Sequence, residues 1–476
     1  MSRPNILLIT TDQHNAGVLG CAGNRCVRTP HLDRLAQEGV CFEEAFTPHC
    51  VCTPARTSIF TGQTAACHGV NYNINLREDQ PDPPRFTGLD AEATAFPQVL
   101  ADHGYRTGFV GKLHAKQAGS RHFGLQTCRL AEGKGQFVEF GSGPDDYRLH
   151  LLEQGYPDSA WRTWELPGYA EQGWVTSPLP VEDTIDGWTG AEAVRYLESV
   201  SGPFFCWVSF SGPHTPWDPP RPYDRLYNPG EIPLPARREG ELEEKAPRWV
   251  DRLAQTIPAT PPTSIDGGRP GGIANAYSRF SDKQVREMLS AYYGQITLID
   301  DQIGRVLSVL ESRGLTENTL VIFTADHGDY LGNNWAFFKY GAQYDSLARI
   351  PFVMRWPAGI RGGQRRNDLV SLVDIAPTVL AAVGLRPVDP VVGCSLLPLL
   401  SGDAGTWRDA LVWLDGPRCV TTRQWRYLRW GDGMEELYDR VSDPHDLHNL
   451  VARGNQHPVR QRLSAKLEAA RKDCRG

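Results

Sequence analysis

The sequence predicts a doubly wound α/β sheet, because β-prone apolar runs alternate along the chain with segments of helical period. The first run, residues 5–11, is continuous and β-prone, as is typical of a buried parallel strand, and Asp12 follows it directly. Further strand-like runs occupy residues 107–110, 204–210, 320–324 and 351–354. Such sheets bind ligands beyond the carboxyl ends of their strands, so polar residues there are candidates for a functional site.

Two helices stand out between the strands. Residues 29–39 have Pro30 near their start and an apolar face that includes Leu32 and Leu35. A longer helix is expected after Ser281, a suitable N-cap, because apolar residues keep a 3.6-residue period through residues 285–310.

We expect a main domain over residues 1–400 and a small C-terminal α+β subdomain over residues 401–476. Residues 115–180 and 215–280 are rich in Gly, Pro and aromatic residues, which indicates long insertions over one edge of the sheet. Short alternating runs at 410–414, 418–423 and 426–430 predict a small antiparallel sheet, and the periodic segment 459–470 predicts a final helix.

Composition narrows the class of protein. The chain has 476 residues, a hydrophobic content of 40% and a net charge of −7, so nucleic acid is not an expected partner. The N-terminal apolar run has four residues, too few for a signal peptide, and no run approaches the ~20 residues that span a bilayer. The 11 cysteines lack regular spacing, which favours reduced thiols. We therefore expect a cytoplasmic protein without a membrane partner; a homo-oligomer remains possible.

Residues 49–58, HCVCTPARTS, allow two interpretations. From Cys50 they have the H-C-x5-R spacing of cysteine-dependent phosphatases, in which backbone N–H groups surround a phosphate and glycine permits the tight turn. Pro54 removes one of these donors, and none of the five intervening residues is glycine. The alternative, in which Cys52 is the reactive residue and Cys50 is a buried bystander, is therefore favoured.

Four residues at two strand ends form a plausible site for a divalent cation: Asp12, Gln13, Asp326 and His327. Two carboxylates, an amide oxygen and an imidazole can together bind such an ion, and the nitrogen ligand favours Mn²⁺ slightly over Ca²⁺. A helix N-cap for Asp12 and an ordinary turn at Asp326 are the structural alternatives.

Six motifs, in order along nearly the whole chain, resemble those of the type I, formylglycine-dependent sulfatases of the alkaline phosphatase superfamily. They are PNILLITTDQ (4–13), CTPARTSIFTG (52–62) with its C-x-P-x-R, GYRTGFVGKLH (104–114), TADHGD (324–329), SLVDIAPTVLAAVGL (371–385) and ELYDRVSDPHDLHNL (436–450). The resemblance is nearest to the branch of choline sulfatases and phosphonate monoester hydrolases. It implies an alkaline-phosphatase-like mixed sheet and the metal-dependent hydrolysis of a small-molecule sulfate ester.

The resemblance also implies that a separate formylglycine-generating enzyme converts Cys52 to an aldehyde. In its hydrate one hydroxyl would bind the metal and attack sulfur, so that Cys52 counts among the metal ligands. The second hydroxyl would then lose its proton and expel sulfate. A plain serine or cysteine has no second hydroxyl, so this step is not available to it.

Roles for the remaining residues follow from the same resemblance. Arg56 would hold the diol and a metal ligand, and His114 would contact the diol as the base of the elimination. The expected substrate-binding residues are Lys112 and Lys339 on the sulfate oxygens, His214 as the acid for the leaving group, and Asn73. A buried core histidine, an ordinary turn and a solvated lysine are the alternatives for His114, His214 and Lys339.

A phosphonate monoester or phosphodiester hydrolase with the same nucleophile and metal site is the alternative function. Gln13 and His327 favour it, because that branch shares them, whereas Lys112 and His114 are sulfatase-like. A non-catalytic or transferase relative is a third class, which the intact set of residues opposes. Choline, sugar and aryl sulfates all remain open as substrates.

Overall fold

The computed structural model describes residues 3–73, 88–90, 92–117, 122–132, 145–254, 277–339, 341–387, 390–402, 405–454 and 458–473. Within them an eight-stranded sheet has the order β5-β4-β6-β1-β7-β8-β2-β9. Its strands are β1 (Asn5–Thr11), β2 (Val40–Phe42), β4 (Arg106–Gly111), β5 (Thr127–Leu130), β6 (Phe204–Ser209), β7 (Thr319–Ala325), β8 (Phe352–Arg355) and β9 (Gln364–Arg366). Only β8 runs antiparallel to its neighbours in this sheet, so the expected mixed α/β sheet is confirmed.

Strand β1 lies at the centre of the sheet, between β6 and β7. Its side chains alternate between two cores, with Ile6 and Leu8 on one face and Leu7 and Ile9 on the other. The continuous apolar run is explained by this burial on both faces.

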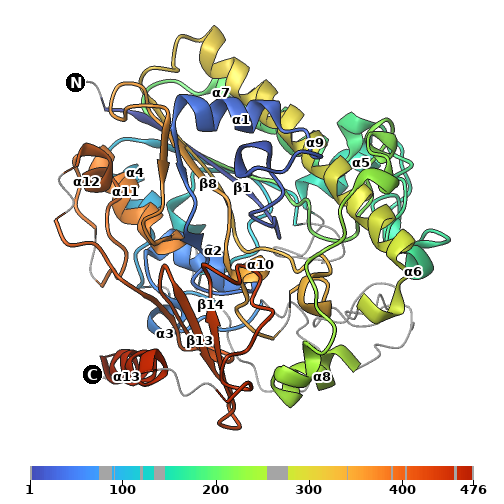
Figure 1. Cartoon of the computed structure of the whole chain (residues 1–476). Coiled ribbons are helices and arrows are strands. Elements are labelled where there is room, and N and C mark those ends of the chain that lie inside the picture. Colours follow the sequence, from blue (N-terminus) through green and yellow to red (C-terminus); the bar gives the residue numbers. More distant parts are fainter. Residues whose placement is uncertain are drawn as a thin grey trace.

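Helices cover both faces of the sheet. The long α9 (Asp282–Ser312) packs with α1 (Pro30–Glu38) and α7 (Ile185–Ser199). These three helices lie in the upper part of the view in Figure 1. The opposite core includes side chains of α2 (Cys52–Thr61), α4 (Phe96–Asp102) and α11 (Ile375–Ala382). As expected, Ser281 caps α9, in a capping box with Gln284.

The C-terminal part forms an antiparallel sheet of β11 (Leu411–Trp413), β12 (Arg418–Thr421), β13 (Trp425–Arg429) and β14 (Glu435–Asp439), followed by α13 (Pro458–Asp473). One face of this sheet packs against the main body in a cluster that includes Phe46 and Tyr344, and the other packs against α13 through Leu463 and Leu467. In Figure 1 the sheet lies low in the view with α13 beside it. The small sheet and final helix were expected, but β14 was not; the domain boundary at residue 400 stays a prediction.

The expected insertions contain more regular structure than their composition indicated. Residues 115–180 supply β5, at the edge of the main sheet, and α5 (Asp146–Glu153), while residues 215–280 supply α8 (Pro247–Ala254). Parts of both segments, 118–121, 133–144 and 255–276, lie outside the described residues.

The shorter elements are β3 (Ala45–Phe46), β10 (Val370–Ser371), α3 (Ala65–His68), α6 (Tyr169–Gln172), α10 (Asp345–Ala348) and α12 (Leu397–Ser401). None of the helices in the described ranges is long and apolar enough to cross a membrane.

Candidate active site

Two aspartates meet where neighbouring parallel strands end. Strands β1 and β7 pair in register up to Thr11 and Ala325, so Asp12 and Asp326 follow side by side. Both side chains are fully buried. This is the carboxyl edge at which the sequence placed a functional site.

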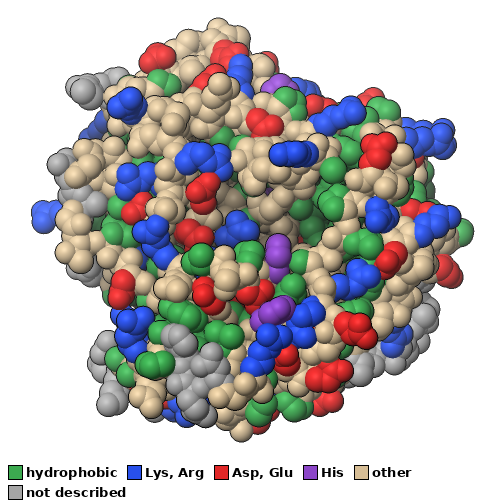
Figure 2. All heavy atoms as spheres, in the orientation of Figure 1, with side chains coloured by type: hydrophobic (Ala, Val, Ile, Leu, Met, Phe, Trp, Pro, Cys, Tyr) green, Lys and Arg blue, Asp and Glu red, His purple; other side chains and the backbone are tan. Residues whose placement is uncertain are grey.

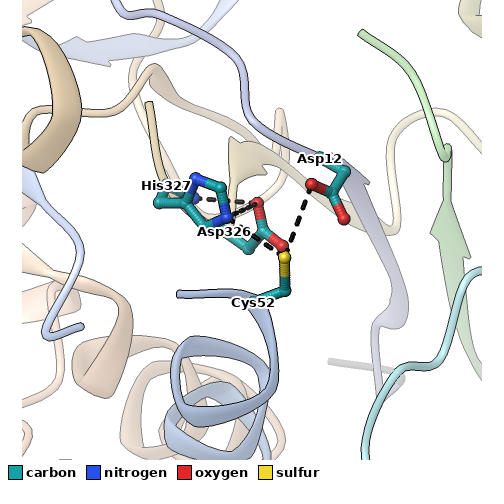
Figure 3. Close-up of side chains that lie close together, drawn as sticks. All are labelled: Asp12, Cys52, Asp326 and His327. Carbon is teal, nitrogen blue, oxygen red and sulfur yellow. Dashed lines mark hydrogen bonds and ion pairs between the residues drawn. The ribbon is translucent and has the colours of Figure 1, made fainter. Parts of the chain in front are cut away.

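Cys52 is the first residue of α2, and its thiol points at these strand ends (Figure 3). Its Sγ lies 3.2 Å from Nε2 of His327 and 3.7 Å from Oδ1 of Asp12. Asn73 accepts a hydrogen bond from the backbone N–H of Thr53 at 3.1 Å and so helps to fix the start of the helix. Its expected contact with substrate stays a prediction.

Arg56 lies one turn further along α2 and joins both aspartates. Its Nη2 and Nε donate to Asp12 and Asp326 at 3.1 and 3.0 Å, and its Nη1 donates to the backbone oxygen of Lys112 and to Oγ of Ser209. The guanidinium is fully buried, so it holds the ends of β1, β4, β6 and β7 in one arrangement.

Two lysines add positive charge around the thiol. Nζ of Lys112 lies 2.6 Å from Oδ2 of Asp12, and Nζ of Lys339 lies 2.7 Å from Sγ of Cys52. Burial opposes ionisation of Asp12, but the cations, Lys112 first, hold its pKa well below the usual value. Burial and Asp12 also oppose ionisation of Cys52, yet Lys339, Lys112 and His327 outweigh them and lower its pKa. The site therefore stabilises an anion at the position of Sγ.

Two histidines face the same charges without a hydrogen bond to this cluster. Burial, and then Lys339 and Lys112, hold the pKa of His214 well below its usual value, and its Nδ1 lies 2.6 Å from the backbone oxygen of Thr215. Burial, followed by Lys112 and Arg56, does the same to His114. These surroundings therefore favour the neutral form of both imidazoles.

The donor set fits a divalent cation. The ligand atoms of Asp12, Cys52, Asp326 and His327 all lie within 4.8 Å of one another. Oε1 of Gln13 is buried and accepts no hydrogen bond within the part of the chain that the structure describes, so it is a further oxygen donor. Carboxylate and amide oxygens, an imidazole and the atom carried by residue 52 together suit such an ion.

The structure also shows supporting residues that the sequence did not nominate. Ser209 accepts from Arg56 at the end of β6, and Glu132, beyond β5, accepts the backbone N–H groups of Leu113 and His114. Asp329 accepts from the side chain of Gln13 at 2.6 Å. Asp329 belongs to the TADHGD motif, which was a usable signal; the other two stand in no motif.

The surface of this side of the molecule is hollowed near its centre. Figure 2 shows histidine side chains in that region, with basic, acidic and hydrophobic side chains around it. Cys52 is 1% exposed, whereas Lys339 and His214 are both partly exposed. These two side chains therefore lie nearer to solvent than the thiol does.

Comparisons with known proteins agree with this arrangement. A family profile described as Sulfatase matches residues 4–385, and one described as N-sulphoglucosamine sulphohydrolase, C-terminal, matches residues 333–473. An arylsulfatase of Clostridium perfringens is 29% identical over 97% of this chain and 92% of its own. A multifunctional alkaline phosphatase superfamily protein of Trinickia caryophylli is 27% identical over 95% and 92%. The crystal structure of the phosphonate monoester hydrolase of Agrobacterium radiobacter superposes with a TM-score of 0.81 at 26% identity, covering 99% of this chain and 96% of the other.

Proposed function

Since the chain belongs to the sulfatase family, whose profile spans residues 4–385, we propose that it hydrolyses sulfate esters to an alcohol and sulfate by means of a formylglycine made from Cys52. The observation that carries this proposal is the position of Sγ of Cys52, 2.7 Å from Lys339 and 3.2 Å from His327, in a group with two buried aspartates. A structural cysteine would not require this concentration of charge.

The cation would be held by the side chains of Asp12, Gln13, Asp326, His327 and residue 52, with Mn²⁺ favoured slightly over Ca²⁺ by the imidazole nitrogen. When bound, it would lower the pKa of a hydroxyl of the hydrated aldehyde. The protein itself supplies orientation: Arg56 fixes both carboxylates, and the field of the lysines favours negative charge on residue 52.

The two lysines account for binding of the sulfate group. Lys112 and Lys339 bring two positive charges to the position of residue 52, which suits an anionic ester rather than a neutral one. Burial first, and then the charge of these lysines, lowers the pKa of His214. A bound sulfate anion offsets that charge, so we propose that the ester itself restores the proton that His214 donates to the leaving oxygen.

A second candidate is the hydrolysis of phosphonate monoesters or phosphodiesters. Its support is the likeness to the phosphonate monoester hydrolase structure and the presence of Gln13 and His327 at the metal site. Both reactions would use the same nucleophile, so they differ in the charge and shape of the substrate rather than in the machinery.

The test uses protein co-expressed with a formylglycine-generating enzyme. We expect an aldehyde at residue 52 by peptide mass spectrometry, and activity that a chelator removes and Mn²⁺ or Ca²⁺ restores. The values of kcat/KM for an aryl sulfate, a phenylphosphonate monoester and a phosphodiester rank the two candidates, and choline and sugar sulfates extend the series. Unchanged sulfatase activity in Cys52→Ala would rule the proposal out.

A further inference from the structure

The backbone of Gln13 is held in an uncommon conformation next to the metal cluster. Its φ is 62°, in the left-handed region that few residues other than glycine adopt. The N–H of Gln13 donates to Oδ1 of Asp326 at 3.0 Å, and its carbonyl oxygen accepts from the hydroxyl of Tyr292 at 2.9 Å. Both contacts fix where the side chain begins.

The side chain of Gln13 is held at one end only. Its Nε2 donates to Oδ2 of Asp329 at 2.6 Å, whereas Oε1 is buried and accepts no hydrogen bond among the described residues. Burying an amide oxygen without a partner is unfavourable, unless a ligand takes the place of the missing donor.

Asp329 is itself fixed by the loop that follows the metal turn. Its side chain is fully buried, and its Oδ1 accepts the backbone N–H groups of Leu331 at 2.8 Å and Phe338 at 2.9 Å. With Oδ1 occupied by two donors, Oδ2 is the atom left for Gln13. The carboxylate thus offers only an acceptor to the amide.

We propose that Asp329 is a positioning residue of the metal site: by accepting a hydrogen bond from the side-chain Nε2 of Gln13, it fixes Oε1, rather than the NH₂ group, as the atom that faces the cation. The two ends of an amide are nearly equal in size, so shape alone does not choose between them. The wrong orientation would aim two N–H donors at a positive ion. This inference rests on the metal dependence in the proposed function.

Asp329 also connects the metal site to substrate binding. The N–H of Phe338 that it accepts immediately precedes Lys339, whose Nζ lies 2.7 Å from Sγ of Cys52. One carboxylate therefore holds the amide ligand and the start of the segment that carries the lysine.

The informative change is Asp329→Asn. If the new amide keeps its oxygen on the two backbone N–H groups, its NH₂ faces Gln13, which must then turn Oε1 away from the cation to accept that donor. If it turns round, its NH₂ meets the two backbone donors instead. Either arrangement costs a ligand or a hydrogen bond, so we expect Mn²⁺ to bind about 10- to 100-fold more weakly.

The double variant Asp329→Asn with Gln13→Glu restores the match. One oxygen of the glutamate accepts the new NH₂ and the other is free for the cation. The affinity of the double variant for Mn²⁺ should therefore be at least as high as about one third of the wild-type affinity, since a difference of about threefold is usual when the surroundings of a hydrogen bond change. Asp218→Asn is the matched control, because Asp218 accepts from Nε2 of Gln295 at 2.7 Å in the same way, outside the metal cluster. The Asp218→Asn protein should bind Mn²⁺ with the same affinity as the wild type.

The measurement is calorimetric titration of MnCl₂ into the chelator-treated full-length protein with Cys52 left as the thiol, so no activity is needed. Wild-type affinity in Asp329→Asn overturns the positioning role while leaving the metal site intact. Failure of the wild type to bind Mn²⁺ overturns both the inference and the metal dependence. Should Asp329→Asn not fold, the double variant decides: folded protein that binds Mn²⁺ supports the inference, and folded protein that does not overturns it.

Discussion

The ammonium of Lys339 lies 2.7 Å from the sulfur of Cys52, although 287 positions separate the two residues. Cys52 begins α2, and Lys339 follows the turn that carries Asp326 and His327. Burial opposes the charge of the lysine, but Cys52 and the two aspartates outweigh it and raise its pKa. The surroundings of Lys339 therefore favour its positive charge beside the thiol of Cys52.

Replacing Lys339 with alanine should lower kcat/KM for a sulfate ester about 10²- to 10³-fold, the usual effect of losing one preorganised group that stabilises transition-state charge. Lys339→Arg, which keeps the charge, should recover part of the loss. Lys283→Ala is the control, because that side chain is 85% exposed on α9 and its removal should leave the rate unchanged. A wild-type rate in Lys339→Ala would remove the lysine from the mechanism.

A second prediction concerns Arg56, which donates hydrogen bonds to Asp12, Asp326, Ser209 and the backbone of Lys112. A lysine has a single ammonium group and cannot reproduce the planar set of N–H donors of the guanidinium, so Arg56→Lys leaves buried acceptors unpaired. We expect a loss of about 3–5 kcal/mol in the free energy of unfolding.

The measurement for Arg56→Lys is urea denaturation of protein that carries the Cys52 thiol. Because Arg56 belongs to the C-x-P-x-R maturation motif, using the unmodified thiol in both proteins excludes a difference in maturation from the comparison. Arg34→Lys is its control, since Arg34 and its partner Glu311 are 42% and 46% exposed and such pairs contribute about 0–1 kcal/mol. Equal losses in the two variants would contradict a special role for the buried arginine.

The sequence predicted the parts of the site that stand at strand ends. Asp12 and Asp326 follow continuous β-prone runs. Such runs and the 3.6-residue period of α9 are local patterns, so the central strands and α9 could be predicted from the sequence. Cys52 was chosen over Cys50 by local chemistry as well, because Pro54 lacks a backbone donor.

What the sequence did not predict depends on distant contacts. Glu132 gains its role from two backbone N–H groups that another strand brings to it, and no local pattern marks that meeting. Strand β14 was missed because residues 435–439 mix two glutamates with Leu437 and Tyr438, and their burial comes from packing against other segments. The helix of Cys52 is buried along its whole length, so it shows no amphipathic pattern.

A third prediction is a pH dependence that arises from Glu132. Burial and Asp145 raise its pKa from 4.5 to about 7, while its Oε2 lies 3.7 Å from Nδ1 of His114. The folded protein thus binds this proton more tightly than the unfolded chain does. The resulting stability is fully present below pH 4.5 and is lost as the pH rises through 7.

Glu132→Gln removes that titration. Relative to the variant, the wild type should lose up to about 3 kcal/mol of unfolding free energy between pH 4.5 and pH 7, as measured by urea denaturation across this range. Glu239→Gln, at an exposed glutamate, should show a constant difference from the wild type. A constant difference for Glu132→Gln as well would show that its carboxyl titrates normally.

The last prediction concerns the contact between the C-terminal sheet and the main body. Arg426 of β13 is fully buried and pairs with Asp446 and, at 3.3 Å, with Asp345 at the start of α10. Arg426→Met leaves Asp446 buried without its principal cation, so the free energy of unfolding should fall by about 3–5 kcal/mol. Arg453→Met is the control, because Arg453 is 42% exposed in its pair with Glu244 and should contribute about 0–1 kcal/mol.

Because Asp345 lies only six positions beyond Lys339, we also expect kcat to fall in Arg426→Met at temperatures where the protein remains folded. Loss of stability with kcat unchanged would show that the C-terminal sheet supports the fold without positioning the lysine.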